Sequence, residues 1–103
     1  AISALTKNLA DELGPFSITA NVVHPGFTIT ERTPELLEEI AGRTNSTVEA
    51  VRARIEAATS SRRLNTADDI AALVAFLASE RGGVINGEAL HAGGGVAGSI
   101  FSY

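Results

Sequence analysis

A short β-branched run, Ser17–His24, constrains the fold of this chain more than any other feature of its sequence. Apolar residues fall on both sides of the expected strand, and Pro25-Gly26 closes it. A strand that is apolar on both faces is typical of a parallel sheet covered by helices. A second strand is expected at Glu88–Ala92, with helical patterns between the two. The sequence therefore predicts an α/β fold with parallel strands joined by right-handed helical crossovers.

Apolar residues recur at helical spacing in four segments, which begin near Ile2, Pro34, Val48 and Thr66. Hydroxyl side chains and glycines mark their expected ends. The expected N-terminal caps are Thr33, Ser46 (in a capping box with Glu49) and Thr66; the expected terminators are Gly14 in a left-handed conformation, Gly42 and Gly82-Gly83. The second helix is expected at Pro34–Ala41, and an apolar tail at Val96–Tyr103.

Two strands make an incomplete sheet, since one edge of the pair would remain open. The sequence shows no internal repeat and no domain boundary. We therefore expect residues 1–103 to be the carboxyl-terminal part of one larger α/β domain. The chain starts at Ala1 in a helical pattern without a secretory leader, and it has no cysteine, so a cytoplasmic origin is expected.

The composition excludes several classes of function. The absence of cysteine rules out disulfide frameworks and thiolate metal sites, and two histidines are too few for a histidine-based centre. Eight basic against twelve acidic residues, a net charge of −4, predict no nucleic-acid partner. The longest apolar run, Ile70–Ala78, is too short to cross a bilayer.

Three groups of residues, in a defined order, carry a resemblance to a known family. They are Ala4–Gly14 with Asn21–Gly26 and Thr30, then Arg63-Leu64 with Asp68–Ala71 and Val74–Ser79, and last Asn86–Leu90 with Gly94-Gly95. Together they resemble the second half of the classical short-chain dehydrogenase/reductases. The resemblance implies the last two strands and flanking helices of a Rossmann-type doubly wound sheet. It also implies a parent enzyme that uses NAD or NADP to interconvert an alcohol and a carbonyl.

In that family the loop after the first of these strands touches the nicotinamide end of the cofactor. The resemblance therefore implies a set of cofactor-binding residues: Pro25, Gly26, Phe27, Thr28 and Thr30. The backbone of Thr28 and the hydroxyl of Thr30 are the expected partners of the carboxamide or a phosphate. From the residues alone, an ordinary turn is the favoured interpretation of Pro-Gly after a strand, and the resemblance to the family reverses that preference.

Segment 34–58 corresponds to the variable substrate lid of the family. The residues expected to line an apolar substrate pocket are Phe27, Leu36, Leu37 and Ile40. Their helical spacing fits a structural core equally well. The acidic residues Glu35, Glu38 and Glu39 are expected on a solvated face.

The catalytic tyrosine and lysine of the family, four residues apart on one helix, have no counterpart in this sequence. The only lysine is Lys7, with Ser3 four residues before it, and the only tyrosine is Tyr103. Reduction of a carbonyl needs a proton donor with a tuned pKa. We therefore assign no catalytic residue and no metal ligand, and expect the isolated chain to be inactive. The alternative is a non-catalytic interaction module that retains this half of the fold.

Several other residues receive structural interpretations. Gly93–Gly98 matches G-x-G-x-x-G, but too few residues follow for a phosphate-binding helix, so a flexible strand exit is expected. His24 and His91 are expected to be structural, and Asn21 is expected to satisfy a backbone group. Gly93 stands where the family commonly has aspartate before its terminal glycine pair.

The resemblance also implies partners for the intact protein. In the family the first helix, and the Asp68–Ser79 helix with the last strand, form dimer interfaces, and both helices here carry apolar stripes. We expect a homo-oligomer, a tetramer or a dimer, acting on a small-molecule alcohol or carbonyl, without a nucleic-acid or membrane partner.

Overall fold

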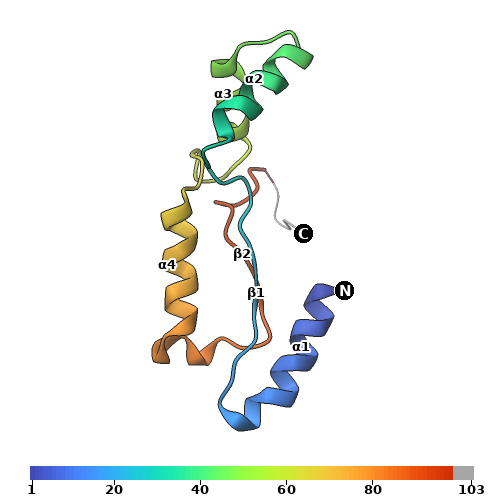
Figure 1. Ribbon diagram of the computed structural model, residues 1–103, viewed down its shortest axis with the longest axis vertical. Coiled ribbons are helices and arrows are strands. Elements are labelled where there is room, and N and C mark those ends of the chain that lie inside the picture. The colour runs from blue at the N-terminus through green and yellow to red at the C-terminus, as the bar shows by residue number, and fades with distance from the viewer. Residues whose placement is uncertain (99–103) are drawn as a thin grey trace. The chain divides into compact units, whose positions relative to one another are not determined.

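The structure, a computed structural model, describes residues 1–98 and divides into two compact parts (Figure 1). The first part comprises Ala1–Pro25 and Asp68–Ala92; the second comprises Gly26–Ala67 and the described residues 93–98. The elements in chain order are α1 (Ile2–Leu13), the 3₁₀ turn η1 (Gly14–Phe16), β1 (Val22–His24), α2 (Thr33–Arg43), α3 (Val48–Ala57), α4 (Ala67–Ala78), the 3₁₀ turn η2 (Glu80–Val84) and β2 (Ala89–His91). The end of the tail expected at Val96–Tyr103 lies outside the described residues.

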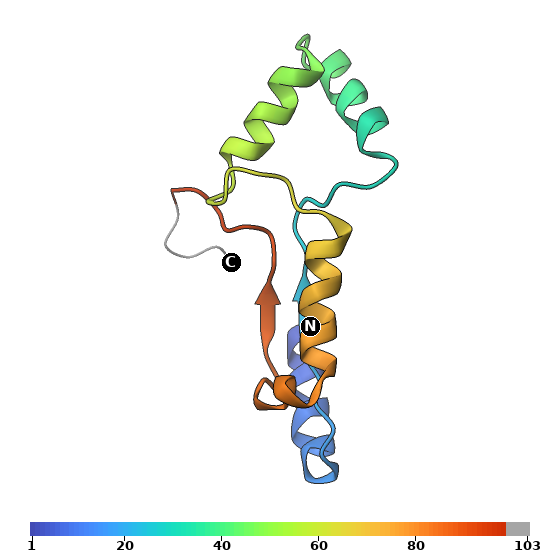
Figure 2. The ribbon, with the colours of Figure 1, turned by 90° about the vertical axis from the view of Figure 1, so that its left-hand side faces the viewer.

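The first part is built on β1 and β2, which pair in parallel as the sequence predicts (Figure 2). The pairing sets Val22 opposite Ala89 and His24 opposite His91. Each strand has three residues, fewer than the expected Ser17–His24 and Glu88–Ala92. The ladder ends early because side chains, rather than backbone groups alone, pair the residues that precede the strands.

Two asparagines extend the strand pairing beyond the ladder. The Asn86 Oδ1 accepts a hydrogen bond from the Ala20 amide at 2.9 Å. In the opposite direction, Asn21 donates through Nδ2 to the Ile85 carbonyl at 3.0 Å and accepts at Oδ1 from the Glu88 amide at 3.0 Å. The expectation that Asn21 satisfies a backbone group is therefore confirmed.

The left-handed residue expected at Gly14 lies elsewhere. Gly14 has φ −53° and ψ −44°, which is right-handed helical geometry, and the left-handed residue is Ser17 with φ 61°. Pro15 accounts for the shift, because its fixed φ suits the first residues of a new helical turn. The chain therefore continues into η1, and the Ser17 amide closes the turn on the Gly14 carbonyl at 2.9 Å.

The glycine pair expected to end the last helix also lies inside a helical turn. The α4 helix begins after Thr66, as expected, but ends at Ala78, and both Gly82 and Gly83 belong to η2. Gly82 is buried, and a Cβ on it would collide with the Phe76 carbonyl oxygen and the Leu77 backbone. Its role is close packing rather than helix termination.

The second part has its core between α2 and α3. Leu37, Ala41 and Val51 form the buried cluster, and the partly buried residues packed against it are Ile40, Val48 and Ile55. These residues follow the helical spacing that the sequence predicts. The pair is joined by the short connection 44–47, so the two helices bury their apolar stripes against each other.

The helix ends in this part differ from the expected ones by one or two residues. The N-cap of α2 is Arg32, and α2 includes Gly42 and ends with a cap at Thr44. The N-cap of α3 is Thr47 rather than Ser46, and its hydroxyl accepts a hydrogen bond from the Ala50 amide at 3.1 Å. Ser46 and Thr47 each carry a hydroxyl that can cap a helix, and in the structure Thr47 takes the N-cap position of α3.

Several large apolar side chains of the first part are exposed. The most exposed are Val84, Phe16, Ile2 and Leu5, at 87%, 73%, 60% and 58%. Within residues 1–98, no helix has the length and apolarity needed to cross a bilayer, and no three metal-ligating side chains come together.

We predict that Asn21→Ala lowers the free energy of unfolding by about 1–3 kcal/mol, because it removes both hydrogen bonds to residues before β2. Denaturant unfolding of the protein measures the change. The matched control is Asn8→Ala, an exposed position on α1, which should shift stability by less than about 0.5 kcal/mol. Equal effects of the two substitutions would contradict the assigned role of Asn21.

Candidate functional site

A cavity of about 390 Å³ lies between the segment that follows β1 in the chain and the first turns of α2. Its lining residues are Gly26, Phe27, Thr28, Thr30, Arg32, Thr33, Glu35, Leu36 and Glu39. The volume falls in the range of small-molecule sites. Four of the five expected cofactor-binding residues line it; Pro25 is not among the lining residues.

The position of Thr28 is set by a partner far away in the sequence. Thr28 forms an isolated parallel bridge with Asn65, in which the Ile29 amide donates to the Asn65 carbonyl at 2.7 Å. Asn65 is buried, so this anchor is held within the second part. The bridge uses the neighbouring amide, which leaves the peptide groups of Thr28 available to a ligand. The Thr28 hydroxyl makes only a long contact, 3.5 Å, to the Gly26 carbonyl.

The Thr30 hydroxyl is oriented by the entry of α2. The Thr30 amide donates to the buried hydroxyl of Thr33 at 2.8 Å, and Thr30 Oγ1 accepts from the Arg32 amide at 3.2 Å. Since Thr30 Oγ1 is an acceptor in this turn, its proton can be donated to a ligand oxygen. Thr28 and Thr30 therefore line the same cavity, each held by a hydrogen-bonded local backbone.

Gly26 is required by its conformation and by its surroundings. Its φ is +67°, and a Cβ built on it would lie 2.7 Å from the Cα of Gly93. The backbone after β2 therefore passes directly against the cavity wall. This contact gives a physical reason for glycine at position 26.

The four residues expected to line the substrate pocket divide into two pairs. Phe27 and Leu36 line the cavity. Leu37, 3% exposed, belongs to the buried α2–α3 cluster, and Ile40 packs against that cluster. Leu37 and Ile40 therefore stabilise the helix pair, in agreement with the core interpretation that their spacing also allowed.

Sequence reasoning missed the charged residues of the cavity. Arg32, Glu35 and Glu39 line it, whereas Glu38 does not. All three glutamates are exposed, as expected for a solvated face. The spacing i, i+3 and i+7 from the helix cap was the available signal, because it sets these side chains on one face of α2. Among the described residues none of the three takes part in an ion pair.

The two histidines lie together at the ends of the paired strands. The rings of His24 and His91 are stacked, with centroids 4.6 Å apart and planes 15° apart. Desolvation, and then the charge of His24, lower the pKa of His91. A second positive charge this close would be unfavourable, so the pair favours a neutral His91.

A parallel strand pair, connected through helices and followed by a threonine-bearing turn over a cavity, defines a piece of a Rossmann-type α/β protein. Solved structures support this class. A short-chain dehydrogenase family protein from Francisella tularensis has a TM-score of 0.80 at 27% identity over 90% of this chain and 38% of its own. YwfH, an NADPH-dependent reductase involved in bacilysin biosynthesis, has a TM-score of 0.80 at 33% identity over 95% of this chain and 37% of its own.

Sequence comparison specifies the class further. The family described as enoyl-(acyl carrier protein) reductase matches residues 1–97. The short-chain reductase NovJ of Streptomyces niveus is 40% identical over 97 residues, 92% of this chain and 35% of its own length. FabG of Haemophilus influenzae, a 3-oxoacyl-[acyl-carrier-protein] reductase, is 40% identical over 95 residues, with coverage of 92% and 35%. The chain belongs to this family of short-chain dehydrogenase/reductases and spans about a third of the length of these relatives.

We predict that Gly26→Ala lowers stability by about 2–4 kcal/mol, the combined cost of a left-handed alanine and a backbone overlap with Gly93. The matched control is Gly42→Ala inside α2, where a Cβ meets nothing within 4 Å. That substitution should raise stability by about 0.5–1 kcal/mol. Thermal unfolding of both variants measures the difference, and a neutral Gly26→Ala would contradict the close approach.

Proposed function

We propose that this chain supplies the nicotinamide-binding turn and the substrate lid of an NADPH-dependent short-chain reductase acting on a small carbonyl compound. The observation that carries the proposal is the cavity lined by Thr28 and Thr30 together with the apolar side chains of Phe27 and Leu36. NADPH is favoured by the relatives: BacG of Bacillus subtilis, an NADPH-dependent reductase, is 33% identical over 97% of this chain and 39% of its own length.

The donor set of the cavity fits the nicotinamide end of such a cofactor. A carboxamide has one acceptor oxygen and one donor nitrogen, and Thr28 offers both a peptide N–H and a carbonyl. The Thr30 hydroxyl adds a donor for the carboxamide or for a phosphate oxygen. When bound, the cofactor would supply the hydride that reduces the carbonyl.

The apolar and charged walls would determine which substrate enters. Phe27 and Leu36 exclude water from the turn, which strengthens the polar contacts made there. Arg32, Glu35 and Glu39 supply charges of both signs along α2, the first helix of the lid segment 34–58. We propose that these five side chains bind the substrate, and that Leu37 and Ile40 support the lid from within.

We also propose that the intact protein is a homo-oligomer. Most of the exposed large apolar side chains lie on the first part of the structure, and they include Ile2 and Leu5 of α1 and Val74 and Phe76 of α4. Apolar surface of this extent is favourable to bury in an interface. The same two helices carry the interfaces that the resemblance implies.

We predict that the purified 103-residue chain does not oxidise NADPH with a β-ketoacyl thioester or any other carbonyl substrate. The physical reason is that the family's proton donor and its neighbouring ammonium are not in this sequence. Absorbance at the reduced nicotinamide band measures turnover, and a complete relative such as FabG serves as the positive control. Steady turnover by the chain would contradict the prediction.

We predict that Thr30→Val in the complete reductase raises the KM for NADPH about tenfold, because one hydrogen bond to the cofactor is worth about 1.4 kcal/mol. Steady-state kinetics measure this change, and Thr30→Ser should restore most of the affinity. The control is Thr44→Val at the end of α2, where the hydroxyl bonds only the Ile40 carbonyl. A cofactor KM that Thr30→Val leaves unchanged would remove Thr30 from the site.

A further inference from the structure

The glycine-rich segment after β2, for which a flexible exit is expected, is hydrogen-bonded to the end of the α2–α3 pair. We call Gly93–Gly98 the strap. The Ser61 amide donates to the Gly94 carbonyl at 2.9 Å, and the Ala97 amide donates to the Ala58 carbonyl at 2.9 Å. The Ser61 hydroxyl adds a third bond to the Gly94 carbonyl at 3.1 Å. The strap is therefore an ordered connection within the second part.

The strap lies too close to its partners for side chains. Gly94 and Gly95 have φ of +80° and +86°. A Cβ on Gly95 would lie 2.7 Å from Ser60 Oγ and 2.9 Å from Ser60 Cβ, and one on Gly94 would lie 3.2 Å from Ser61 Oγ. Both the conformation and the close approach require glycine at these positions.

The other end of the strap meets the cavity. Gly93 lies against Gly26, which lines the cavity wall. The strap thus contacts Gly26, in the turn that follows β1 in the chain, through Gly93. It contacts the residues that follow α3 through Gly94 and Ala97. The strap therefore contacts both the cavity wall and the end of the lid segment 34–58.

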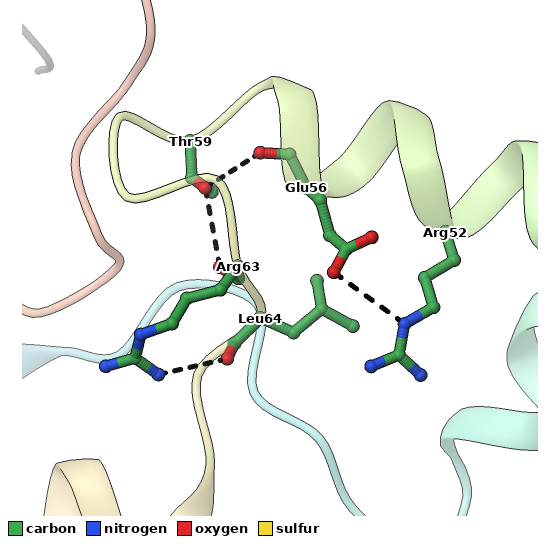
Figure 3. Close-up of polar contacts among 5 residues, drawn as sticks. All are labelled: Arg52, Glu56, Thr59, Arg63 and Leu64. Carbon is green, nitrogen blue, oxygen red and sulfur yellow. Dashed lines mark hydrogen bonds and ion pairs between the residues drawn. The ribbon is translucent and has the colours of Figure 1, made fainter.

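The loop that the strap binds is itself rigid (Figure 3). The Thr59 hydroxyl donates to the Glu56 carbonyl at 3.0 Å and contacts the Arg63 carbonyl at 3.4 Å, so it closes the loop on the last turn of α3. Arg63 Nη1 donates to the Leu64 carbonyl at 3.3 Å, and Leu64 is 4% exposed. These hydrogen bonds connect the loop that contains Ser60 and Ser61 to the last turn of α3.

From α3 the connection reaches the cavity through packed side chains. Val51 of α3 is 2% exposed and packs in one cluster with Leu37 of α2. Leu36, the residue before Leu37 in the chain, lines the cavity. Close-packed interiors move as units, so the position of α3 determines where the cavity face of α2 lies.

We propose that the strap holds the lid in place over the cavity, and that Gly94, Gly95 and Ser61 are positioning residues for substrate binding. This proposal rests on the proposed function, since the lid acts on a substrate. Release of the strap from Ser60 and Ser61 leaves the Gly26–Gly93 contact and the Thr28–Asn65 bridge in place, and it lets α3 and the part of α2 that packs against it move relative to the cavity. Substrate affinity then falls, whereas cofactor affinity and the rate at saturation change little.

The test compares Gly95→Ala with Gly98→Ala in the complete protein. Both glycines have positive φ, +86° and +78°, but within residues 1–98 a Cβ on Gly98 meets no atom within 4 Å, so the control carries the same backbone strain without the overlap with Ser60. Ser61→Ala is a milder second variant that removes only the hydroxyl bond to the strap. Amide hydrogen exchange and the steady-state constants are measured for all three.

For Gly95→Ala we expect exchange at the Ser61 and Ala97 amides and along α2 to accelerate about tenfold. The KM for the carbonyl substrate should rise by a similar factor, while kcat and the KM for NADPH stay within about twofold. Ser61→Ala should show the same pattern with a smaller amplitude, and Gly98→Ala should resemble the parent protein.

Two results would overturn the proposal: unchanged exchange along α2 in Gly95→Ala, or equal effects of Gly95→Ala and Gly98→Ala. If the complete protein shows no reductase activity, the proposed function fails separately. The exchange comparison then still decides whether the strap restrains α2.

Discussion

The first part of the structure depends on hydrogen bonds that Asn21 and Asn86 each make to the backbone of the opposite segment. Two parallel strands of three residues have too few backbone bonds to define a register. The two amide side chains add bonds at Ala20, Ile85 and Glu88. Because each asparagine serves the opposite strand, a shift by one residue would break bonds on both sides.

This register also determines where the chain leaves the strands. Gly26 and Gly93 each follow the last residue of their strand, His24 or His91, by two positions. Within the second part the backbones of Gly26 and Gly93 lie next to each other. Glycine is needed at position 26 because its φ is +67° and a Cβ there would lie 2.7 Å from the Gly93 Cα.

Hydrophobic periodicity predicted the helices and the α2–α3 core, because burial of an apolar stripe is a property of many residues at once. Leu37 and Val51 lie in the core, where their spacing places them. Helix ends were predicted less well. Gly14 and Gly82 were expected to end helices, yet Gly14 keeps right-handed helical geometry before Pro15, and Gly82 lies inside η2, where a Cβ would collide with the Phe76 carbonyl oxygen. A single permissive residue adopts whatever its neighbours require.

The cavity was predicted where the signal is local in sequence and missed where it is not. Pro25-Gly26 marks a turn at the end of a strand, and the resemblance to the family singled out Thr28 and Thr30 within the segment that follows it. The bridge from Thr28 to Asn65 joins residues on either side of α2 and α3, and no pattern around Asn65 predicts it.

The strap was also mispredicted because its partners lie far away in the sequence. A run of glycines predicts freedom, because glycine loses the most conformational entropy when it is ordered. Ordering is favourable here because Ser60, Ser61 and Ala58 supply hydrogen-bond partners at a distance that only glycine permits. The composition of a segment therefore states what its backbone can adopt, whereas the partners that it meets decide whether it is flexible. In this chain the glycine-rich strap, whose backbone can adopt many conformations, connects the cavity wall at Gly26 to the residues that follow α3.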